Sequence, residues 1–338
     1  MKPPSELRQD LVTGDWVVVA TGRTRRPRDF TTLKGVPRAP KRGCPFEKLS
    51  PSALAVFDAR GEGYRLTAKD RSYLKKHWWV EVVPNKFPAF GPGQCQVQRR
   101  IGPHRAQDGV GFHEVLITRD HDRSPGLLEA AELAVFFKAY RERYLALKDE
   151  PCVEYISIFH NHGPAAGASI SHPHSQLIAI PVVPPDVGRS LKGSRAYFHQ
   201  QRRCVHCTMI AFEQHSRARV IFSNRDFIAF APYVSRTAFE VRIFPKRHNP
   251  AFETVTDSEL REVVDALSMV LGRMYRKLND PAYNFFIHTA PTGQGDYRHY
   301  HWHIEILPKT AIWAGFEIGT GIEISTISPE AAAKFLRQ

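Results

Sequence analysis

The strongest constraint on the fold is an ordered set of features that occurs twice in the 338-residue chain. Each copy has a β-rich segment, a histidine, a long stretch with helical spacing, another β-rich segment, a glycine-rich turn and a His-x-His motif that leads into a strand. His121 and His172 are 51 positions apart, and His248 and His301 are 53 apart. Matched elements in one order are hard to obtain by chance, so we predict a duplicated fold.

The duplication predicts an α+β protein of two half-domains, each with an antiparallel sheet and one helix. A capping box, Thr256-x-x-Glu259, marks the start of the second helix. We expect residues 1–186 to form the first half, 187–200 to be a linker after a proline-rich segment, and 201–338 to form the second half. Strands are expected at 79–83, 112–118, 153–159, 177–180, 226–230, 238–244, 283–287 and 304–307, and helices at 124–148 and 256–278.

Composition narrows the class of protein and of substrate. The apolar share of 42% and the charged share of 24% are those of an ordinary globular protein. No apolar run reaches the ~20 residues that cross a membrane, and no signal-peptide pattern is present, so we expect a cytoplasmic protein without a membrane partner. The net charge of +13 attracts anions. A small phosphorylated substrate accounts for this charge as well as a polynucleotide does, and a solvated basic surface is the alternative. The basic residues form no long run and no RNA-binding motif, which argues against nucleic acid.

The segment from Asn161 to Gln176 is the first candidate for a substrate site. Its glycines and alanines let the backbone approach a ligand closely, and Ser169 and backbone amides can donate hydrogen bonds to phosphate oxygens. His172 and His174 alternate along a strand, so one imidazole can face a metal and the other a substrate. A segment this polar and rich in turns is poorly suited to a hydrophobic core.

The cysteines point to metal sites. Five cysteines, an odd and sparse number, argue against a disulfide framework. A C-x-x-C pair opens the second copy, and with two repeat histidines it makes a Cys2His2 set suited to a closed zinc site: Cys204, Cys207, His248 and His301. The alternative is a pair of inert buried thiols. The matching set in the first half is Cys44, His121 and His172.

The stretch from Asn161 to Gln176 resembles the active-site signature of galactose-1-phosphate uridylyltransferases, a family of the histidine-triad superfamily. Residues 16–27 are similar to the family's N-terminal nucleotide-contacting strand and loop, 85–88 to its uridine-side loop, and 301–305 to the motif of its second half. The resemblance implies a duplicated histidine-triad-like fold and a homodimer. It also implies a nucleotide sugar and a sugar 1-phosphate as substrates.

The resemblance also implies a mechanism. His174 would attack the α-phosphorus of a nucleotide sugar, release sugar 1-phosphate, and pass the nucleotidyl group to a second sugar 1-phosphate. One ring nitrogen of His174 is expected to donate to a backbone carbonyl near residues 161–163. Gln176 stands where hydrolytic histidine-triad proteins carry a third histidine, which favours transfer over dinucleotide hydrolysis. The nucleotide and phosphate contacts implied by the family are Arg23, Arg26, Asn85, Asn161, Ser169 and Gln176.

The family often has Cys-Pro-Phe-Cys where this chain has Cys44-Pro-Phe-Glu47. Glu47 is a candidate replacement ligand because carboxylates bind zinc, and the alternative is a weakened or empty first site. The resemblance therefore implies one or two zinc ions per chain. Some members hold their second metal with a glutamate and three histidines; His288 is the extra candidate here, and it suits a substrate contact equally well.

Segment 314–321 resembles the family loop that reaches across a dimer to the sugar phosphate. With a histidine of the second half, it gives the expected sugar-phosphate residues: Phe316, Glu317 and His303. A lysine and a glutamine of the well-known bacterial form are replaced by Ala311 and Glu323. The Phe-Glu-x-Gly-Thr-Gly version also resembles plant-type ADP-glucose phosphorylases of the same family. We expect uridylyl transfer from UDP-glucose to galactose 1-phosphate, with ADP-glucose phosphorolysis as the alternative.

Overall fold

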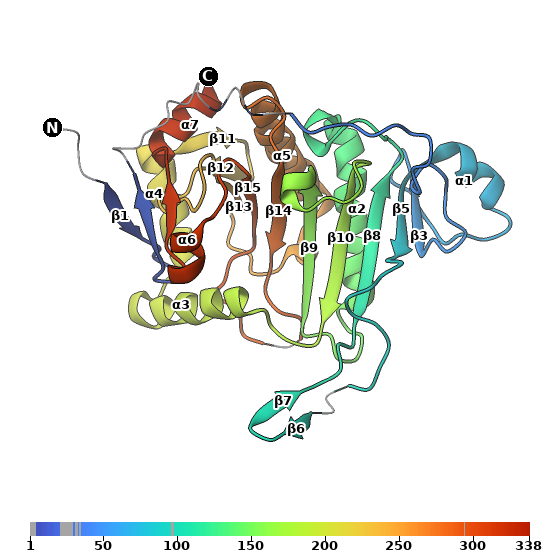
Figure 1. The fold of residues 1–338 in the computed structure, drawn as a ribbon, viewed down its shortest axis with the longest axis horizontal. Helices are drawn as coiled ribbons and strands as arrows, with labels where there is room; N and C mark the ends of the chain where they lie inside the picture. The colour runs from blue at the N-terminus through green and yellow to red at the C-terminus, as the bar shows by residue number, and fades with distance from the viewer. Residues whose placement is uncertain (1–4, 21–29, 31–32, 34, 96–97, 294) are drawn as a thin grey trace.

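The structure is a computed structural model that describes residues 5–20, 30, 33, 35–95, 98–293 and 295–338. Among these residues the largest element is an antiparallel sheet of eleven strands, in the order β11-β12-β13-β15-β14-β9-β10-β8-β5-β3-β4 (Figure 1). The C-terminal half supplies β11 (Val220–Ser223), β12 (Phe227–Phe230), β13 (Val241–Pro245), β14 (Tyr283–His288) and β15 (His303–Pro308). The N-terminal half supplies β3 (Ala55–Asp58), β4 (Gly63–Tyr64), β5 (Trp78–Pro84), β8 (Phe112–Thr118), β9 (Tyr155–His162) and β10 (His174–Ile180).

The two halves share this sheet. β9 and β14 pair antiparallel, with Phe159 opposite Phe286, so the central strands of the sheet come from different halves. Residues 187–200, which we expected as a linker, lie inside helix α3 (Pro185–Gln201). Pro185 takes the first helical position, where the missing N–H of proline has no cost, so the proline-rich segment starts a helix.

Each half contributes one long helix to the same face of the sheet (Figure 1). α5 (Asp257–Lys277) begins as predicted, because Oγ1 of Thr256 accepts a hydrogen bond from the backbone N–H of Glu259 at 3.2 Å. α2 (Ala130–Leu147) begins later than predicted, after the short 3-10 helix η3 (Pro125–Leu127). The expected α+β class, with the duplicated histidine-triad-like architecture, is confirmed.

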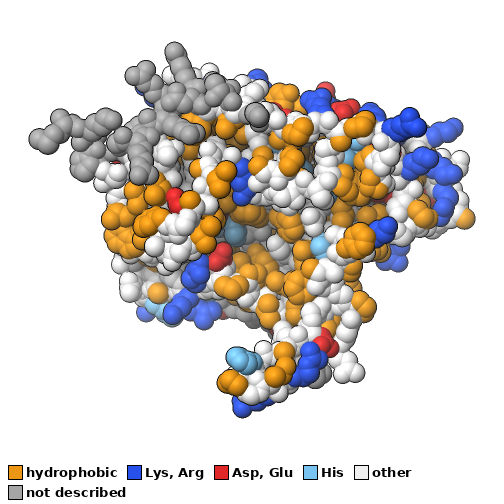
Figure 2. Space-filling view, in the orientation of Figure 1, with side chains coloured by type: hydrophobic (Ala, Val, Ile, Leu, Met, Phe, Trp, Pro, Cys, Tyr) orange, Lys and Arg blue, Asp and Glu red, His pale blue; other side chains and the backbone are white. Residues whose placement is uncertain are grey.

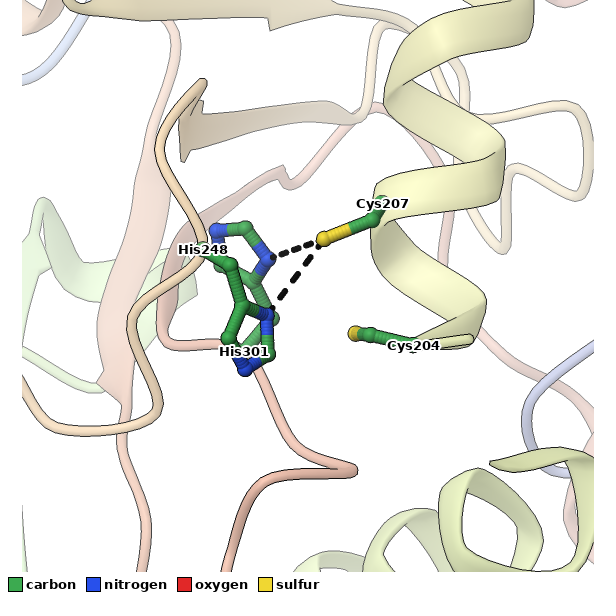
Figure 3. Close-up of side chains that lie close together, drawn as sticks. All are labelled: Cys204, Cys207, His248 and His301. Atoms are coloured by element: carbon green, nitrogen blue, oxygen red, sulfur yellow. Dashed lines mark hydrogen bonds between the residues drawn. The ribbon is translucent and has the colours of Figure 1, made fainter. Parts of the chain in front are cut away.

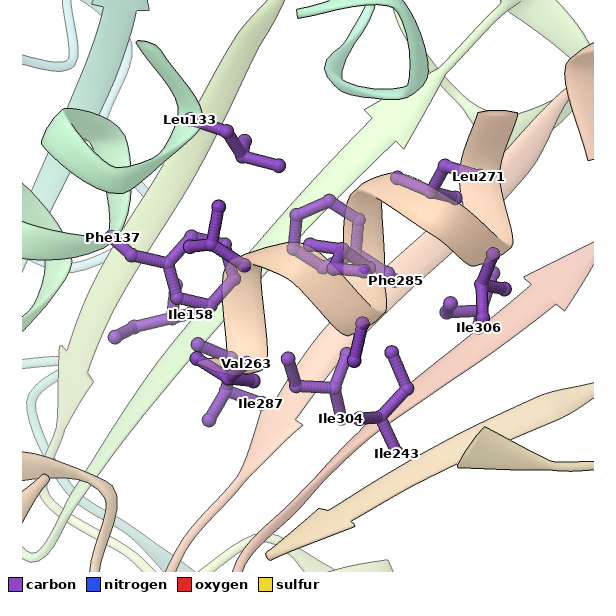
Figure 4. Packing of buried hydrophobic residues seen from close by; sticks show 14 of the residues in the cluster. Leu133, Phe137, Ile158, Ile243, Val263, Leu271, Phe285, Ile287, Ile304 and Ile306 are labelled. Carbon is purple, nitrogen blue, oxygen red and sulfur yellow. The ribbon is translucent and has the colours of Figure 1, made fainter. Parts of the chain in front are cut away.

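The core lies between these two helices and the sheet (Figure 4). Leu133 and Phe137 of α2 and Val263 and Leu271 of α5 are almost completely buried. They pack on apolar side chains that alternate along the central strands: Ile158, Ile243, Phe285, Ile287, Ile304 and Ile306. Each such side chain contributes about 1.5–3 kcal/mol of transfer free energy. The alternate residues of the same strands therefore face the opposite side of the sheet.

The remaining elements surround the sheet. β1 (Glu6–Gln9), β2 (Trp16–Val19) and β16 (Glu323–Ser325) form a small sheet, and β6 (Arg99–Ile101) and β7 (His104–Ala106) form a hairpin. The shorter helices are α1 (Arg71–His77), η4 (Pro164–Ala166), α4 (Val205–Ser216), η5 (Phe252–Thr254), α6 (Gly315–Thr320) and α7 (Pro329–Arg337). No helix in the described part of the chain is long and apolar enough to span a membrane.

Cys95 and Cys152 form a disulfide that the sequence did not predict. It joins the segment between β5 and β6 to the turn that follows α2. The odd cysteine count argued against a disulfide framework, and this single pair does not make one. The other three cysteines, Cys44, Cys204 and Cys207, are free, and all three belong to the predicted metal sets.

Candidate active site and metal sites

His174 begins β10, directly after the glycine-rich loop, and is 8% exposed. The loop leaves β9 at Gly163, whose φ of +83° is in the region that favours glycine. A Cβ at this position would lie 2.6 Å from Cγ2 of Val36, so the close approach of the two segments also requires glycine. The sequence therefore positions His174 through a turn that tolerates no side chain at its start.

The hydrogen bonding of His174 defines its tautomer. Nδ1 lies 2.9 Å from the carbonyl oxygen of His172. A carbonyl oxygen only accepts, so Nδ1 carries the proton and Nε2 keeps its lone pair. The expected acceptor near residues 161–163 is wrong, because the turn at Pro173 brings the carbonyl two residues upstream within reach. Burial lowers the pKa of His174 below its usual value, which keeps the ring neutral at pH 7.

Gln176 lies two residues further along β10, so its side chain leaves the same face of the sheet as His174. Its Oε1 is 2.7 Å from Nε2 of His113 on β8. Nδ2 of Asn85 lies 3.0 Å from the same ring nitrogen. Asn161, on the neighbouring strand β9, accepts a hydrogen bond from Nδ2 of Asn284 at 2.7 Å. Of the predicted residues, Gln176 thus lies on the strand that carries His174 and Asn161 on a strand beside it, and Asn85, which follows β5, reaches the site through His113.

His113 also belongs to this site, although it was not among the predicted residues. The available signal was a polar residue inside the apolar segment 112–118. Its importance depends on register: β8 pairs with β10 so that His113 lies opposite Ile178, diagonal to Gln176. The antiparallel register that brings together two residues 63 positions apart could not be derived from periodicity alone.

Other predicted residues lie elsewhere. Ser169 is exposed in the loop before β10. Phe316 and Glu317 lie on α6, at the side of the C-terminal half (Figure 1). Arg23 and Arg26 fall outside the described residues.

The first metal set is brought together by the fold. Ligand atoms of Cys44, Glu47, His121 and His172 all lie within 4.8 Å of one another. Oε1 of Glu47 contacts Nδ1 of His121 and lies 3.5 Å from Nδ1 of His172. Sγ of Cys44 lies 3.5 Å from the same nitrogen of His172. Glu47 therefore takes the place that a second cysteine would have.

The second metal set has the same form (Figure 3). Sγ of Cys207 lies 3.4 Å from Nδ1 of His248 and 3.6 Å from Nδ1 of His301, and Cys204 faces the same point. Both cysteines sit at the start of α4, where the first turn fixes their spacing. Hydrogen bonding to Cys204, and then to the two histidines, holds the pKa of the Cys207 thiol well below its usual range.

The donor chemistry of both sets fits zinc. Nε2 of His172 lies 2.7 Å from the carbonyl oxygen of Thr118, and Nε2 of His301 lies 3.0 Å from that of Pro245. These carbonyls fix Nε2 as the donor and leave Nδ1 of each histidine as the ligand atom, which is the usual outer support of zinc histidines. Thiolate, imidazole and carboxylate are all zinc ligands in tetrahedral sites.

A cavity of about 680 Å³ lies on the open face of the sheet, visible as the central hollow in Figure 2, and is lined by residues of both halves, among them Tyr155 and Phe159 of β9. His288, His303 and Glu305 line it, with ligand atoms within 4.8 Å of one another. Burial and two nearby cations, Arg236 and Arg242, lower the pKa of His288 to about 3. In this single chain His303 belongs to this cavity and lies three strands away from His174.

Comparison with known proteins agrees with this geometry. The family model for the N-terminal domain of galactose-1-phosphate uridyl transferase matches residues 3–184, and a domain family of unknown function (DUF4921) matches residues 110–336. The chain belongs to the galactose-1-phosphate uridylyltransferase family. It is therefore an enzyme of the nucleotidyltransferase group, and this family binds metal.

Two relatives within this family differ in substrate. The chain is 32% identical to ADP-glucose phosphorylase of Arabidopsis thaliana, over 98% of this chain and 92% of the relative. It is 27% identical to galactose-1-phosphate uridylyltransferase of Thermotoga maritima, over 98% of both chains. A crystal structure of the Arabidopsis phosphorylase with bound ADP-glucose superimposes with a TM-score of 0.78 and 29% identity, over 99% of both chains.

Proposed function

We propose that this enzyme transfers a nucleoside monophosphate through a covalent bond to Nε2 of His174. One observation carries the proposal: Nδ1 of His174 is fixed on the carbonyl of His172, which leaves a neutral, buried Nε2 as the nucleophile. Nε2 attacks the α-phosphorus, the bond from phosphorus to the sugar-phosphate oxygen breaks, and sugar 1-phosphate leaves. Covalent catalysis divides one difficult displacement into two easier ones.

In the second half-reaction an acceptor oxygen attacks the same phosphorus and the P–N bond breaks. The imidazole returns to its neutral form with its proton still on Nδ1, held by the His172 carbonyl. Gln176 on the same face donates its amide hydrogens to the phosphoryl oxygens as charge develops on them. An amide cannot protonate a leaving group, so Gln176 favours transfer to phosphate over hydrolysis.

For substrates we propose ADP-glucose as donor and inorganic phosphate as acceptor. Support comes from the 32% identity to an ADP-glucose phosphorylase, against 27% to a uridylyltransferase of similar coverage. The sequence Phe316-Glu317-Ile318-Gly319-Thr320-Gly321 also resembles that of plant-type ADP-glucose phosphorylases. This reading replaces UDP-glucose and galactose 1-phosphate, our first expectation, as the leading one. Uridylyl transfer remains the second candidate because several curated relatives carry that name.

The test compares both reactions in one preparation. Incubation with ADP-glucose or UDP-glucose alone, followed by intact-protein mass spectrometry, identifies the nucleotide that labels His174. Steady-state kcat/KM is then measured for ADP-glucose with phosphate and for UDP-glucose with galactose 1-phosphate. We expect the adenine reaction to be faster by at least tenfold, about 1.4 kcal/mol of transition-state stabilisation. A uridine reaction that is equally fast or faster assigns the second candidate function.

For metal we propose zinc in both sets, with Cys204, Cys207, His248 and His301 as the firmer site. The metal would fix the loop between His172 and the start of β10, since His172 is both a ligand and the source of the carbonyl for His174. Zinc supplies folding free energy at such closed sites. His174 itself is not in either set.

We also propose a homodimer in which α6 reaches a neighbouring subunit. Residues 312–318, which lead into and form the start of α6, include several large apolar side chains that are exposed in the single chain: Ile312, Trp313, Phe316 and Ile318. Contiguous exposed apolar surface of this kind marks an interaction site. Sedimentation equilibrium of the wild type and of Ile318→Asp tests it; a monomeric wild type contradicts the proposal.

A further inference from the structure

We propose that His113 is a positioning residue that fixes the orientation of the Gln176 amide. The inference rests on the proposed function, because it concerns how Gln176 presents its donor group to a phosphoryl oxygen. His113 is half-buried on β8, and both of its ring nitrogens have contacts in the structure.

The first contact sets the tautomer. The backbone N–H of Ala89 donates to Nδ1 of His113 at 3.1 Å. An amide N–H can only donate, so Nδ1 must carry the lone pair, and a neutral ring then has its proton on Nε2. The segment that supplies this N–H is held in turn by Asn85, whose Oδ1 accepts from the N–H of Phe87 at 2.9 Å.

The second contact, between Nε2 of His113 and Oε1 of Gln176, fixes the orientation of the Gln176 amide. With its proton on Nε2, His113 donates to Oε1 of Gln176 at 2.7 Å. The amide oxygen is thereby turned toward β8, and the NH2 group is turned away from His113. Nδ2 of Asn85, at 3.0 Å from Nε2, is also a donor, so it packs against the ring in this tautomer without a hydrogen bond.

As a consequence, the Gln176 amide presents its NH2 group, and not its oxygen, to a ligand. An unsupported glutamine amide can rotate and present either its oxygen or its NH2 group to a ligand. An oxygen turned toward a phosphoryl group repels it, whereas the NH2 group stabilises the charge that develops there. The two successive contacts, from Ala89 to His113 and from His113 to Gln176, remove the repulsive orientation before the substrate binds, as supporting hydrogen bonds do for catalytic side chains.

The kinetic test uses His113→Leu, which removes both contacts, and His113→Gln, whose amide hydrogens can still donate to Gln176. We expect His113→Leu to slow formation of the nucleotidyl-His174 adduct from ADP-glucose by about 10- to 100-fold, with KM within about threefold. His113→Gln should recover most of this rate. The exposed His104, on β7, gives a matched control in His104→Leu, which should retain the wild-type rate.

A double-mutant cycle separates positioning from general structural damage. In a Gln176→Ala background, His113→Leu should change the adduct rate by less than about threefold, because the group that it positions is already absent. An undiminished effect in that background overturns the proposal. So does a His113→Gln variant that is as slow as His113→Leu.

A second readout does not depend on activity. In protein labelled with 15N-histidine, the His113 signals are assigned by comparison with His113→Gln. We expect an unprotonated Nδ1 and a protonated Nε2 at pH 8. A proton on Nδ1 contradicts the proposed orientation even if the variants are slow. If the wild type forms no adduct with either sugar nucleotide, the proposed function fails, and the tautomer still decides whether His113 orients the amide.

Discussion

The two halves place a histidine in the same way but surround it differently. His174 donates from Nδ1 to the carbonyl of His172 at 2.9 Å, and His303 donates from Nδ1 to that of His301 at 3.1 Å. Two residues later the first half has the neutral Gln176 and the second half has Glu305. The backbone of the duplicated motif therefore fixes the ring, and the neighbours decide what the ring can do.

The two halves also differ in the residues on the neighbouring strand, which is β8 in the first half and β13 in the second. Thr118 and Pro245 occupy equivalent positions in the two halves, because the carbonyl of each accepts a hydrogen bond from Nε2 of a histidine in a metal set. His113 and Glu240 each lie five residues before these positions, so they are equivalent too. Glu305 pairs with Arg236, and its Oε2 lies 3.7 Å from Nε of Arg242, which also contacts Glu240. In the second half the position of Gln176 therefore carries a carboxylate that is paired with arginines, whereas in the first half it carries an uncharged amide that contacts a histidine.

The largest expected effect tests whether only one half is reactive. His174→Ala should abolish adduct formation and lower kcat by at least about 1,000-fold, or about 4 kcal/mol, because the nucleophile is lost. His303→Ala should still form the adduct and lose at most about tenfold. Mass spectrometry and steady-state kinetics on both variants make the measurement. An adduct in His174→Ala, or none in His303→Ala, would reverse the assignment of the two halves.

The two metal sets should differ in stability. Cys207→Ser removes a thiolate from a Cys2His2 set and should lower stability by about 2–4 kcal/mol, since structural zinc contributes folding free energy directly. Cys44→Ser, in a set that already contains Glu47, should cost less. Thermal melting and elemental analysis of freshly purified proteins compare them. No transition metal in the wild type would contradict both sites, and metal in the second set alone would mean that Glu47 does not replace a cysteine.

The substitution Gln176→Glu places in the first half the carboxylate that the second half has at the equivalent position, Glu305. We expect kcat to fall by about 10- to 100-fold, because a carboxylate beside the α-phosphorus repels the developing charge and loses two donors. The melting temperature should change little, since Gln176 is only partly buried. Single-turnover kinetics with ADP-glucose measures the effect. A rate within twofold of the wild type would mean that the neutral amide is not what separates the two halves.

The smallest expected effect is a change in the stability of the fold, and it concerns Glu81, a buried carboxyl whose equivalent in the second half is an apolar side chain. Burial raises the pKa of Glu81 from 4.5 to about 7, and the same register places Ile228 at its position in the second half. The unfolded chain loses this proton above pH 4.5 and the folded chain only near pH 7, so stability falls across that interval. Glu81→Gln should therefore stabilise the protein by about 1–3 kcal/mol at pH 8 and have little effect at pH 4.5. Urea unfolding at both pH values measures the difference; an equal change at both would contradict the shifted pKa.

Local signals in the sequence predicted local structure well. The capping box located the start of α5, and the two His-x-His motifs and the C-x-x-C pair identified side chains that the fold brings together. Features that depend on tertiary register were missed. The β9–β14 pairing, the role of His113 and the Cys95–Cys152 disulfide each join segments whose proximity no period or spacing encodes. The proline-rich segment was misread because proline at a first helical position resembles proline in a linker.

The pairing of β9 with β14 also bears on how the chain could be divided. If the chain were cut near residue 186, each fragment would have a long central strand without its neighbour, and Tyr155–His162 and Tyr283–His288 would become open edges. Unpaired edges of buried, apolar strands recruit other strands, so the isolated fragments would aggregate or pair with each other. Coexpressed fragments should therefore reassemble across this seam, in the same register that the intact chain uses.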